Sequence, residues 1–200
     1  MLTTLLKESP KNIEILNPNS DKNYINKILT DLNIPVTSLF QEVITNTWGI
    51  LIDQWWLRII GSWDAINRNI LDWNKDKISG ILLIADDILW GFFAVNLWYF
   101  HGEIWSIFYF APELLEWEDL EMKYTDFINW AIKWDTNKFY ESFRWNWWED
   151  EIHQVGINKG LSVYPFLWTE NMGIKDRSRK LVPIDEIWSL SMDFYSKIWS

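Results

Sequence analysis

The chain contains no Cys among its 200 residues. Disulfide bonds, catalytic thiolates and Cys-ligated metal sites are therefore excluded, and the absence fits a reducing compartment. Gly is scarce at 8 residues, where an average domain of this length has roughly 14. The chain does not begin with a basic segment followed by an apolar one, so we expect no signal peptide and a cytoplasmic protein.

The charge balance is acidic, with 28 Asp and Glu against 18 Lys and Arg and a formal net charge of −10. An acidic surface opposes binding to the phosphates of nucleic acids and to anionic lipid. We therefore predict neither a nucleic-acid partner nor a membrane partner. The same charge favours solubility and attracts a basic protein.

One apolar window, residues 80–100, is long enough to consider as a membrane span. Asp86, Asp87 and Asn96 interrupt it, and a charge at mid-bilayer depth is costly. Two buried strands joined by a turn explain this window better than a membrane helix does.

Helical spacing of apolar residues predicts helices over 20–33, 123–134 and 183–199. Short, β-rich apolar segments between 49 and 112 predict a run of strands, and residues 160–168 predict a later one. Strands flanked by helices at both ends are typical of the α+β class. We predict a single domain over residues 1–200, with a largely antiparallel central sheet flanked by N-terminal and C-terminal helices.

Three charged segments allow two interpretations each. The acidic run "EWEDLE" (116–121) is either a docking patch or a solvated turn, and the basic run "KDRSRK" (175–180) is either a contact for an acidic partner or a solvated loop. In "RWNWWEDE" (144–151), Arg144 can stack on aromatic rings in a binding platform, or the rings can belong to the core. For each segment the interpretation without a binding role is favoured.

Trp is abundant, with 17 residues, and several lie where the chain is expected to bend. Trp63 follows Gly61-Ser62, and Trp98 follows Asn96-Leu97 between two predicted strands. Such positions favour a positive φ or a close backbone approach, which Gly permits and a β-carbon resists. If these residues are Trp, we expect the indoles of Trp90, Trp98 and Trp105 to be exposed or to crowd one another.

Five segments resemble the DUF2625 family, a bacterial domain of unknown function, over about residues 10–195. They are "WGILIDQWWLRIIGSW", "ADDILWGFFAVN", "IFYFAPELLEWEDLEMKYTDFINWAI", "FYESFRWNWWEDEI" and "YPFLWTE". The family pattern has Trp at Trp56, Trp73, Trp117, Trp130, Trp145, Trp148, Trp168 and Trp188. It typically has Gly where this chain has Trp48, Trp55, Trp63, Trp90, Trp98, Trp105, Trp134 and Trp147.

The departure from the family is therefore always from Gly to Trp. Our hypothesis is that these eight residues are Gly in the organism, because some bacterial lineages read the codon UGA as Gly whereas a common alternative code reads it as Trp. The high Ile count (26) and the low Ala count (5) fit an AT-rich genome, in which UGA is frequent. The alternative is a Trp-rich protein whose turns have adapted.

The residues alone predict no catalytic site, no metal site and no cofactor. Asp86 and Asp87 can hold a hard cation or act as acid and base, but adjacent residues on a strand point to opposite faces, so capping of a turn is favoured. His101 and His153 lie far apart without metal-ligand spacing and are expected at the surface. No phosphate-binding or nucleophile-elbow motif is present.

The strand-rich centre followed by "YTDF" opening a helix is also similar to the SUKH superfamily. That resemblance implies a non-enzymatic protein-binding fold, many members of which are immunity proteins that neutralise toxins. We therefore predict a protein-interaction module with a basic partner, such as a toxin. The alternative is a small-molecule-binding protein or a hydrolytic enzyme that uses the Asp86/Asp87/Asn96 region, assisted by Glu116 or His101. The predicted ligand or partner surface comprises Asp86, Asp87, Asn96, Glu116 and Glu118.

Overall fold

A computed structural model describes residues 1–16, 21–34, 37–62, 68–134, 136–153, 155–169 and 172–199. Its strands are β1 (Ile13–Leu16), β2 (Gly49–Ile52), β3 (Leu57–Ile60), β4 (Ile81–Asp87), β5 (Phe92–Asn96), β6 (Ser106–Ala111), β7 (Glu116–Lys123), β8 (Lys159–Tyr164) and β9 (Ser178–Pro183). Its helices are α1 (Leu2–Lys7), α2 (Lys22–Asp31), α3 (Leu39–Asn46), α4 (Ile70–Asn74), α5 (Tyr124–Lys133), α6 (Thr136–Phe139), α7 (Trp148–Ile152) and α8 (Ile184–Trp199), with a 3₁₀ turn at Ile174–Asp176.

The main sheet has seven strands in sequence order, β1 to β7, and every neighbouring pair is antiparallel. The four strands β2 to β5 are buried along their whole length, because their residues are almost all apolar. The apolar window at 80–100 forms β4, a turn and β5. The α+β class and the antiparallel central sheet predicted from the sequence are confirmed.

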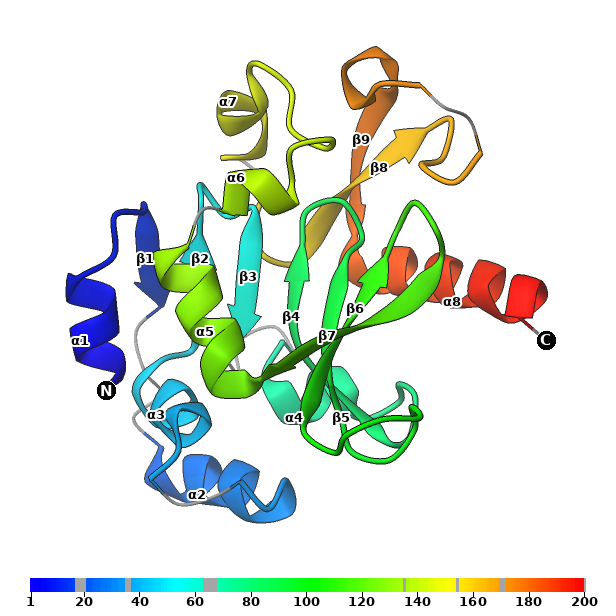
Figure 1. Cartoon of the computed structure of the whole chain (residues 1–200). Helices are drawn as coiled ribbons and strands as arrows, with labels where there is room; N and C mark the ends of the chain where they lie inside the picture. The colour runs from blue at the N-terminus through cyan, green and yellow to red at the C-terminus, as the bar shows by residue number, and fades with distance from the viewer. Residues whose placement is uncertain are drawn as a thin grey trace.

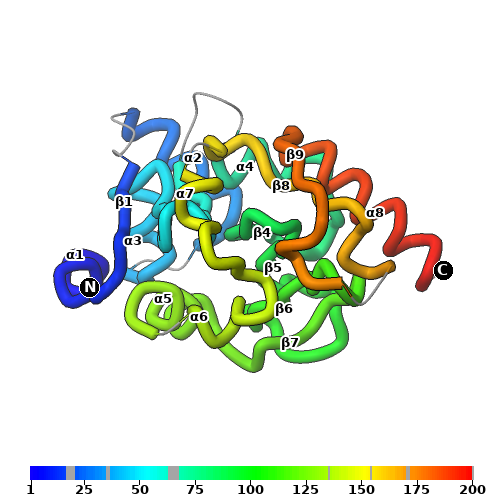
Figure 2. The backbone as a smooth tube through the Cα atoms, turned by 90° about the horizontal axis from the view of Figure 1, so that it is seen from above, coloured from blue at the N-terminus to red at the C-terminus, as the bar shows by residue number. Residues whose placement is uncertain are grey.

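Helices cover both faces of this sheet (Figure 1). Seen from above, α5 lies on one side of β4 to β6, and α4 and α8 lie on the other (Figure 2). On the first side Phe127 of α5 packs on Phe93, and on the second Trp188 of α8 meets Phe92 edge to face at 5.0 Å between ring centroids. Within the described residues no helix is long and apolar enough to cross a membrane.

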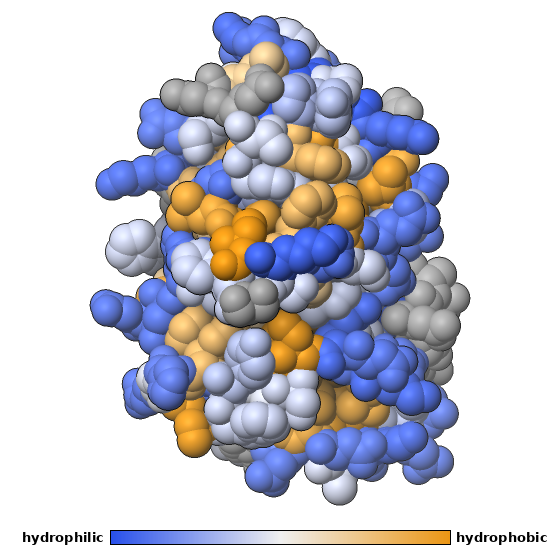
Figure 3. Space-filling view, turned by 90° about the vertical axis from the view of Figure 1, so that its right-hand side faces the viewer, coloured by the Kyte–Doolittle hydropathy of each residue, from blue (hydrophilic) through white to orange (hydrophobic). Residues whose placement is uncertain are grey.

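A second, two-stranded sheet of β8 and β9 lies at one end of the main sheet (Figure 1). The Leu161 N–H donates to the Ile88 carbonyl, and the Trp90 indole N–H donates to the Leu161 carbonyl. These two bonds attach the small sheet to the β4–β5 turn. On the side where α8 ends, hydrophilic side chains divide the apolar surface into separate patches (Figure 3).

Two charged segments that we predicted as a turn and a loop lie wholly or partly in strands. The acidic run 116–121 belongs to β7, and the basic run 175–180 enters β9 at Ser178. Strand β7 lies at the edge of the main sheet, where side chains need not be apolar and charges discourage pairing with other chains. This position explains why a sequence without apolar alternation forms a strand.

Three Trp residues have a positive φ: Trp55 at 75°, Trp90 at 82° and Trp105 at 69°. All three belong to the eight positions at which we predict Gly from the family resemblance, and no other Trp of the described residues has a positive φ. Trp63 lies outside the described residues. Trp98 is 65% exposed, as expected, whereas Trp90 is buried against Phe166 and Trp168, which corrects our expectation for that indole.

The strain at these positions is measurable by comparing Gly with Ala at one site. We expect Trp105→Gly to be more stable than Trp105→Ala by about 1 kcal/mol, because both variants lose the indole but only Ala keeps the β-carbon that opposes a positive φ. At Trp98, whose φ is not positive, the order should reverse, with Ala favoured by roughly 0.5–1 kcal/mol. Urea unfolding of the four variants checks this, and equal stability of Gly and Ala at residue 105 would contradict it.

Candidate functional site

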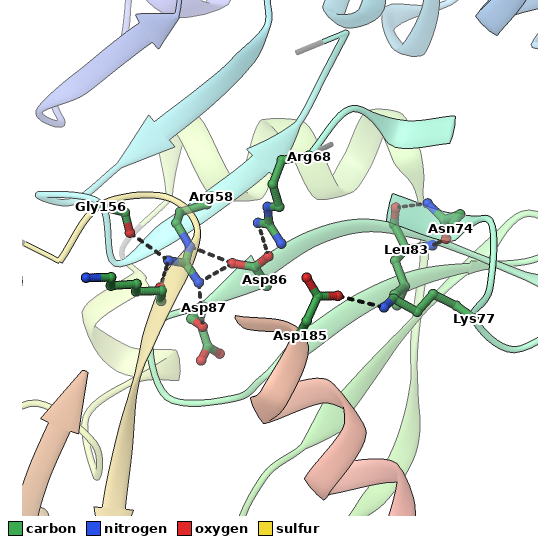
Figure 4. A network of polar contacts seen from close by, with 10 residues as sticks. Arg58, Arg68, Asn74, Lys77, Leu83, Asp86, Asp87, Gly156 and Asp185 are labelled. Atoms are coloured by element: carbon green, nitrogen blue, oxygen red, sulfur yellow. Dashed lines mark hydrogen bonds and ion pairs between the residues drawn. The ribbon is translucent and has the colours of Figure 1, made fainter. Parts of the chain in front are cut away.

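Asp86 is a fully buried carboxylate held by two arginines (Figure 4). Its register partner Arg58, on β3, donates Nε–H to Oδ1, and Arg68 donates to Oδ2 at 2.5 Å. Arg58 also donates to the carbonyl oxygens of Gly156 and Lys159, at the start of β8. Burial lowers the pKa of Arg58, and the Asp86 charge opposes that effect. The carboxylate therefore joins β3, β4 and the β8 segment.

Asp87 points to the opposite face of the sheet and caps the β4–β5 turn. Its Oδ1 accepts hydrogen bonds from Leu89 N–H and Gly91 N–H, both at 2.9 Å, and its Oδ2 accepts one from the Tyr109 hydroxyl at 3.0 Å. Burial raises the pKa of Asp87. The two carboxylates are buried and do not share a site, and Asp87 caps a turn, which is the interpretation that the sequence favoured.

Asn96 lies at the other end of the same hairpin. It pairs with Ile81, five residues along β4 from Asp86, which corresponds to about 17 Å along a strand. Asn96 is fully buried. It therefore cannot line one pocket together with Asp86 and Asp87, and the three-residue region proposed from the sequence is not a single site.

Asn96 instead organises residues 97–105, which we call the Asn96 loop. Its Nδ2 donates to the carbonyl oxygens of Phe100 and Glu103, and its Oδ1 accepts from Phe100 N–H. The carbonyl oxygen of Gly80 accepts hydrogen bonds from three successive loop N–H groups, those of Leu97, Trp98 and Tyr99. These bonds fix the backbone of the loop.

The fixed loop carries exposed apolar side chains beside acidic ones. Tyr99 is 41% exposed and Ile104 is 55% exposed. Lys123 of β7 bonds both the Glu103 carboxylate, at 2.9 Å, and the Ile104 carbonyl, at 3.0 Å, so the loop is attached to the edge strand. The exposed residues on and beside the loop also include Trp98, His101, Glu103, Glu118, Asp119 and Glu121.

The two acidic residues predicted on β7 are accessible, but to different extents. Glu118 is exposed and Glu116 is half-buried. His153 is exposed on the C-terminal side of α7 and contacts the Trp55 ring at 6.3 Å between ring centroids. The residues that the structure describes contain no group of three or more His, Cys, Asp or Glu suited to a metal ion.

A cleft of about 440 Å³, here the Arg144 cleft, lies between the β2–β3 turn, the residues around Lys11 and the α6–α7 region. Arg144 stacks over the rings of Trp148 and Trp56, at 4.3 and 5.0 Å from their centroids. Asp53 accepts from Arg144 at 3.0 Å and lies 3.8 Å from the Lys11 ammonium group. The rings of Trp56 and Trp145 belong to the core, Trp148 lines the cleft, and a binding role for Arg144 stays a prediction.

A second opening of about 460 Å³, here the Glu113 pocket, lies between the β6–β7 turn, the segment after α6 and the end of the β8–β9 hairpin. Glu113, Phe143 and Trp168 are among its lining residues. Burial raises the pKa of Glu113. Sequence reasoning missed this residue, because nothing in "APELL" distinguishes a pocket carboxylate from an ordinary turn residue.

The raised pKa of Asp87 makes stability depend on pH in a defined direction. The folded chain holds this proton more tightly than the unfolded chain does, so the stabilisation declines as pH rises from about 3.9, the value for an unfolded Asp, through the folded pKa. We expect the stability of wild type relative to Asp87→Asn to fall over that interval, as measured by urea unfolding from pH 4 to 8. Tyr109→Phe removes a hydrogen bond that favours ionised Asp87, so it should shift the decline to higher pH. The prediction is wrong if the difference in unfolding free energy between wild type and Asp87→Asn stays constant or grows as pH rises.

Comparison with known proteins supplies the family. Residues 1–187 match the family model described as "Protein of unknown function DUF2625". The chain is 31% identical over 189 residues to the Escherichia coli (strain K12) protein YbfG, whose name describes it as uncharacterised, covering 92% of this chain and 86% of YbfG. It is 33% identical over 174 residues to an uncharacterised protein of Haemophilus influenzae (strain ATCC 51907 / DSM 11121 / KW20 / Rd), covering 82% and 76% of the two chains. No solved structure matches. The chain therefore belongs to the DUF2625 family, as its sequence segments predicted.

Proposed function

We propose that this chain is a protein-interaction module whose docking surface is the Asn96 loop together with the exposed acidic residues of β7. The observation that carries the proposal is the loop itself, in which a buried Asn fixes a backbone that presents Tyr99 and Ile104 to solvent. A preorganised loop loses little entropy on binding. Exposed apolar side chains with a charged rim are typical of protein interfaces.

The charges beside the loop indicate a basic partner. Glu118, Asp119 and Glu121 are exposed along the edge strand, and Lys123 on the same strand is paired with Glu103. The chain as a whole carries a net charge of −10. Such a field speeds the approach of a positively charged protein. A toxin neutralised by an immunity protein, as the SUKH resemblance implies, is one partner of this kind and stays a prediction.

The geometry does not favour the alternative of an enzyme or small-molecule binder built on Asp86, Asp87 and Asn96. Each of the two carboxylates is buried and already bonded by protein donors. Asn96 is bonded within its own loop, at the far end of the hairpin. These side chains serve the stability of the fold, and the surface near Asn96 is left for recognition.

Capture of a partner from the native host at near-physiological salt tests the proposal. We expect Tyr99→Ser with Ile104→Ser to weaken binding of the captured protein by about 10- to 100-fold through loss of apolar contact. Asp119→Lys should slow association, most clearly at low salt. As a matched control, Glu141→Lys makes the same type of charge reversal at an exposed residue outside this surface and should leave affinity nearly unchanged. Failure to capture any partner, or equal effects of Asp119→Lys and Glu141→Lys, would reject the surface.

We also propose that the eight Trp residues at family Gly positions are Gly in the organism. The positive φ of Trp55, Trp90 and Trp105 supports this, because Gly adopts such a φ without strain. The gene should carry UGA at all eight positions and UGG at the other nine Trp positions. Determining the nucleotide sequence of the gene checks this, and UGG codons at the eight positions would refute it.

A further inference from the structure

The Glu113 pocket is built by three segments that are distant in sequence. The β6–β7 turn supplies Glu113, the segment between α6 and α7 supplies Phe143, and the segment after β8 supplies Trp168. The β6–β7 turn is held by N–H groups of Leu114 and Leu115 that donate to the Ala111 carbonyl. The volume of about 460 Å³ is within the range of small-ligand sites.

The Glu113 side chain is half-buried among the residues that the structure describes. It forms no ion pair there, and its Oε2 atom is buried without a hydrogen-bond partner. The negative charges of Asp87 and Glu118 act on it in the same sense as burial, and together they raise its pKa. The backbone N–H of Glu113 donates to its carboxylate and partly opposes this rise in pKa, but the buried Oε2 atom without a partner is unfavourable. A bound cation would remove this cost.

Aromatic rings also line the pocket. Trp168 stacks on Phe166 with 4.6 Å between centroids and an angle of 6° between planes, and it contacts Phe194 at 5.0 Å. These contacts hold the indole in place while leaving it half-buried. Faces of Trp and Phe attract ammonium and guanidinium groups. A pocket lined by both a carboxylate and aromatic rings is therefore complementary to an organic cation.

Arg177 is a cation that also lines the pocket. Its hydrogen bonds explain why the pocket can still accept a second cation. Its guanidinium group donates to the carbonyl oxygens of Pro165, Phe166 and Met172. Its side chain is buried. Arg177 therefore holds the segment that carries Trp168 through bonds to these backbone oxygens.

We propose that the Glu113 pocket binds an organic cation, an alkylammonium or guanidinium group, with Glu113 as its counter-ion and Trp168 and Phe143 as its aromatic wall. The cation is either a free amine or a Lys side chain of a protein. The pocket lies at the opposite end of β7 from the Asn96 loop (Figure 1), so it does not rest on the docking surface proposed above. None of the eight Trp residues in question lines it, whereas Trp134 lines the Arg144 cleft.

Titration of the full chain with n-butylammonium, n-butanol and N-acetyl-lysine methylamide, followed by NMR of the Trp168 indole, tests the site. Both cations should shift the indole signal, and n-butanol should bind at least about tenfold more weakly, because it lacks the charge that Glu113 recognises. This comparison uses the wild-type chain alone and stays informative if a variant fails to fold. Tighter binding of the lysine derivative supports a protein Lys as the natural ligand, and tighter binding of n-butylammonium supports a free amine.

Substitutions then assign the binding to Glu113. Glu113→Gln keeps the shape and removes the charge, so it should weaken both cations about tenfold or more while leaving n-butanol unchanged. Glu118→Gln is the matched control, because Glu118 is an exposed carboxylate on β7 that does not line the pocket. This change should weaken binding of the cations at most two- to threefold. Equal binding of n-butanol and n-butylammonium, or unchanged cation binding in Glu113→Gln, would overturn the proposal.

Discussion

The ion group of Arg58, Asp86 and Arg68 is the constraint on which the rest of the fold depends. All three side chains are at most 6% exposed, and burying charge is unfavourable unless every partner is in place. Asp86 fixes β3 against β4, and Arg58 extends the network to the carbonyl oxygens of Gly156 and Lys159. The position of β8, and with it one wall of the Glu113 pocket, therefore follows from a carboxylate at the end of β4. A register shift of one residue in β4 would turn Asp86 away from both arginines.

The parts of the fold that are predictable from the sequence are those in which burial dictates the residue pattern. Strands β2 to β5 are mostly apolar because both faces of the sheet are covered by helices, and helix α5 shows an apolar face because it packs on that sheet. The strands missed are β1, β7 and β9. Two of them are the edges of the main sheet and the third lies in the two-stranded sheet, so none needs an apolar pattern, and β7 carries "EWEDLEMK". Their pairing depends on distant strands, which local composition does not reveal.

Among the candidate site residues, too, those inside apolar strands stand out in the sequence and the others do not. Asp86 and Asp87 attract attention because carboxylates inside an apolar strand are unusual, yet this setting is the reason that they are buried and bonded. Asn96 matters for a reason that sequence alone does not give, since its role depends on the carbonyl oxygens of Phe100 and Glu103. Glu113 has no sequence signal at all, because its pocket is completed by residues about 30 and 55 positions further along the chain. The sequence thus reveals polar residues inside apolar strands, which need hydrogen-bond partners in the core. It does not reveal a polar residue such as Glu113, which lines a pocket and lacks a partner for one oxygen atom.

Whether the eight positions are Trp or Gly matters more for the strained turns than for the two proposed sites. The Asn96 loop contains Trp98 and Trp105, but its backbone is held by Asn96 and by the Gly80 carbonyl, and its exposed contacts are Tyr99 and Ile104. The Glu113 pocket contains none of the eight. If Gly occupies residue 105, the loop loses a strained φ and keeps its hydrogen bonds. The docking surface therefore does not depend on the reading of the codon, whereas the Glu113 pocket keeps its lining residues but loses the contact between Trp90 and Trp168 if residue 90 is Gly.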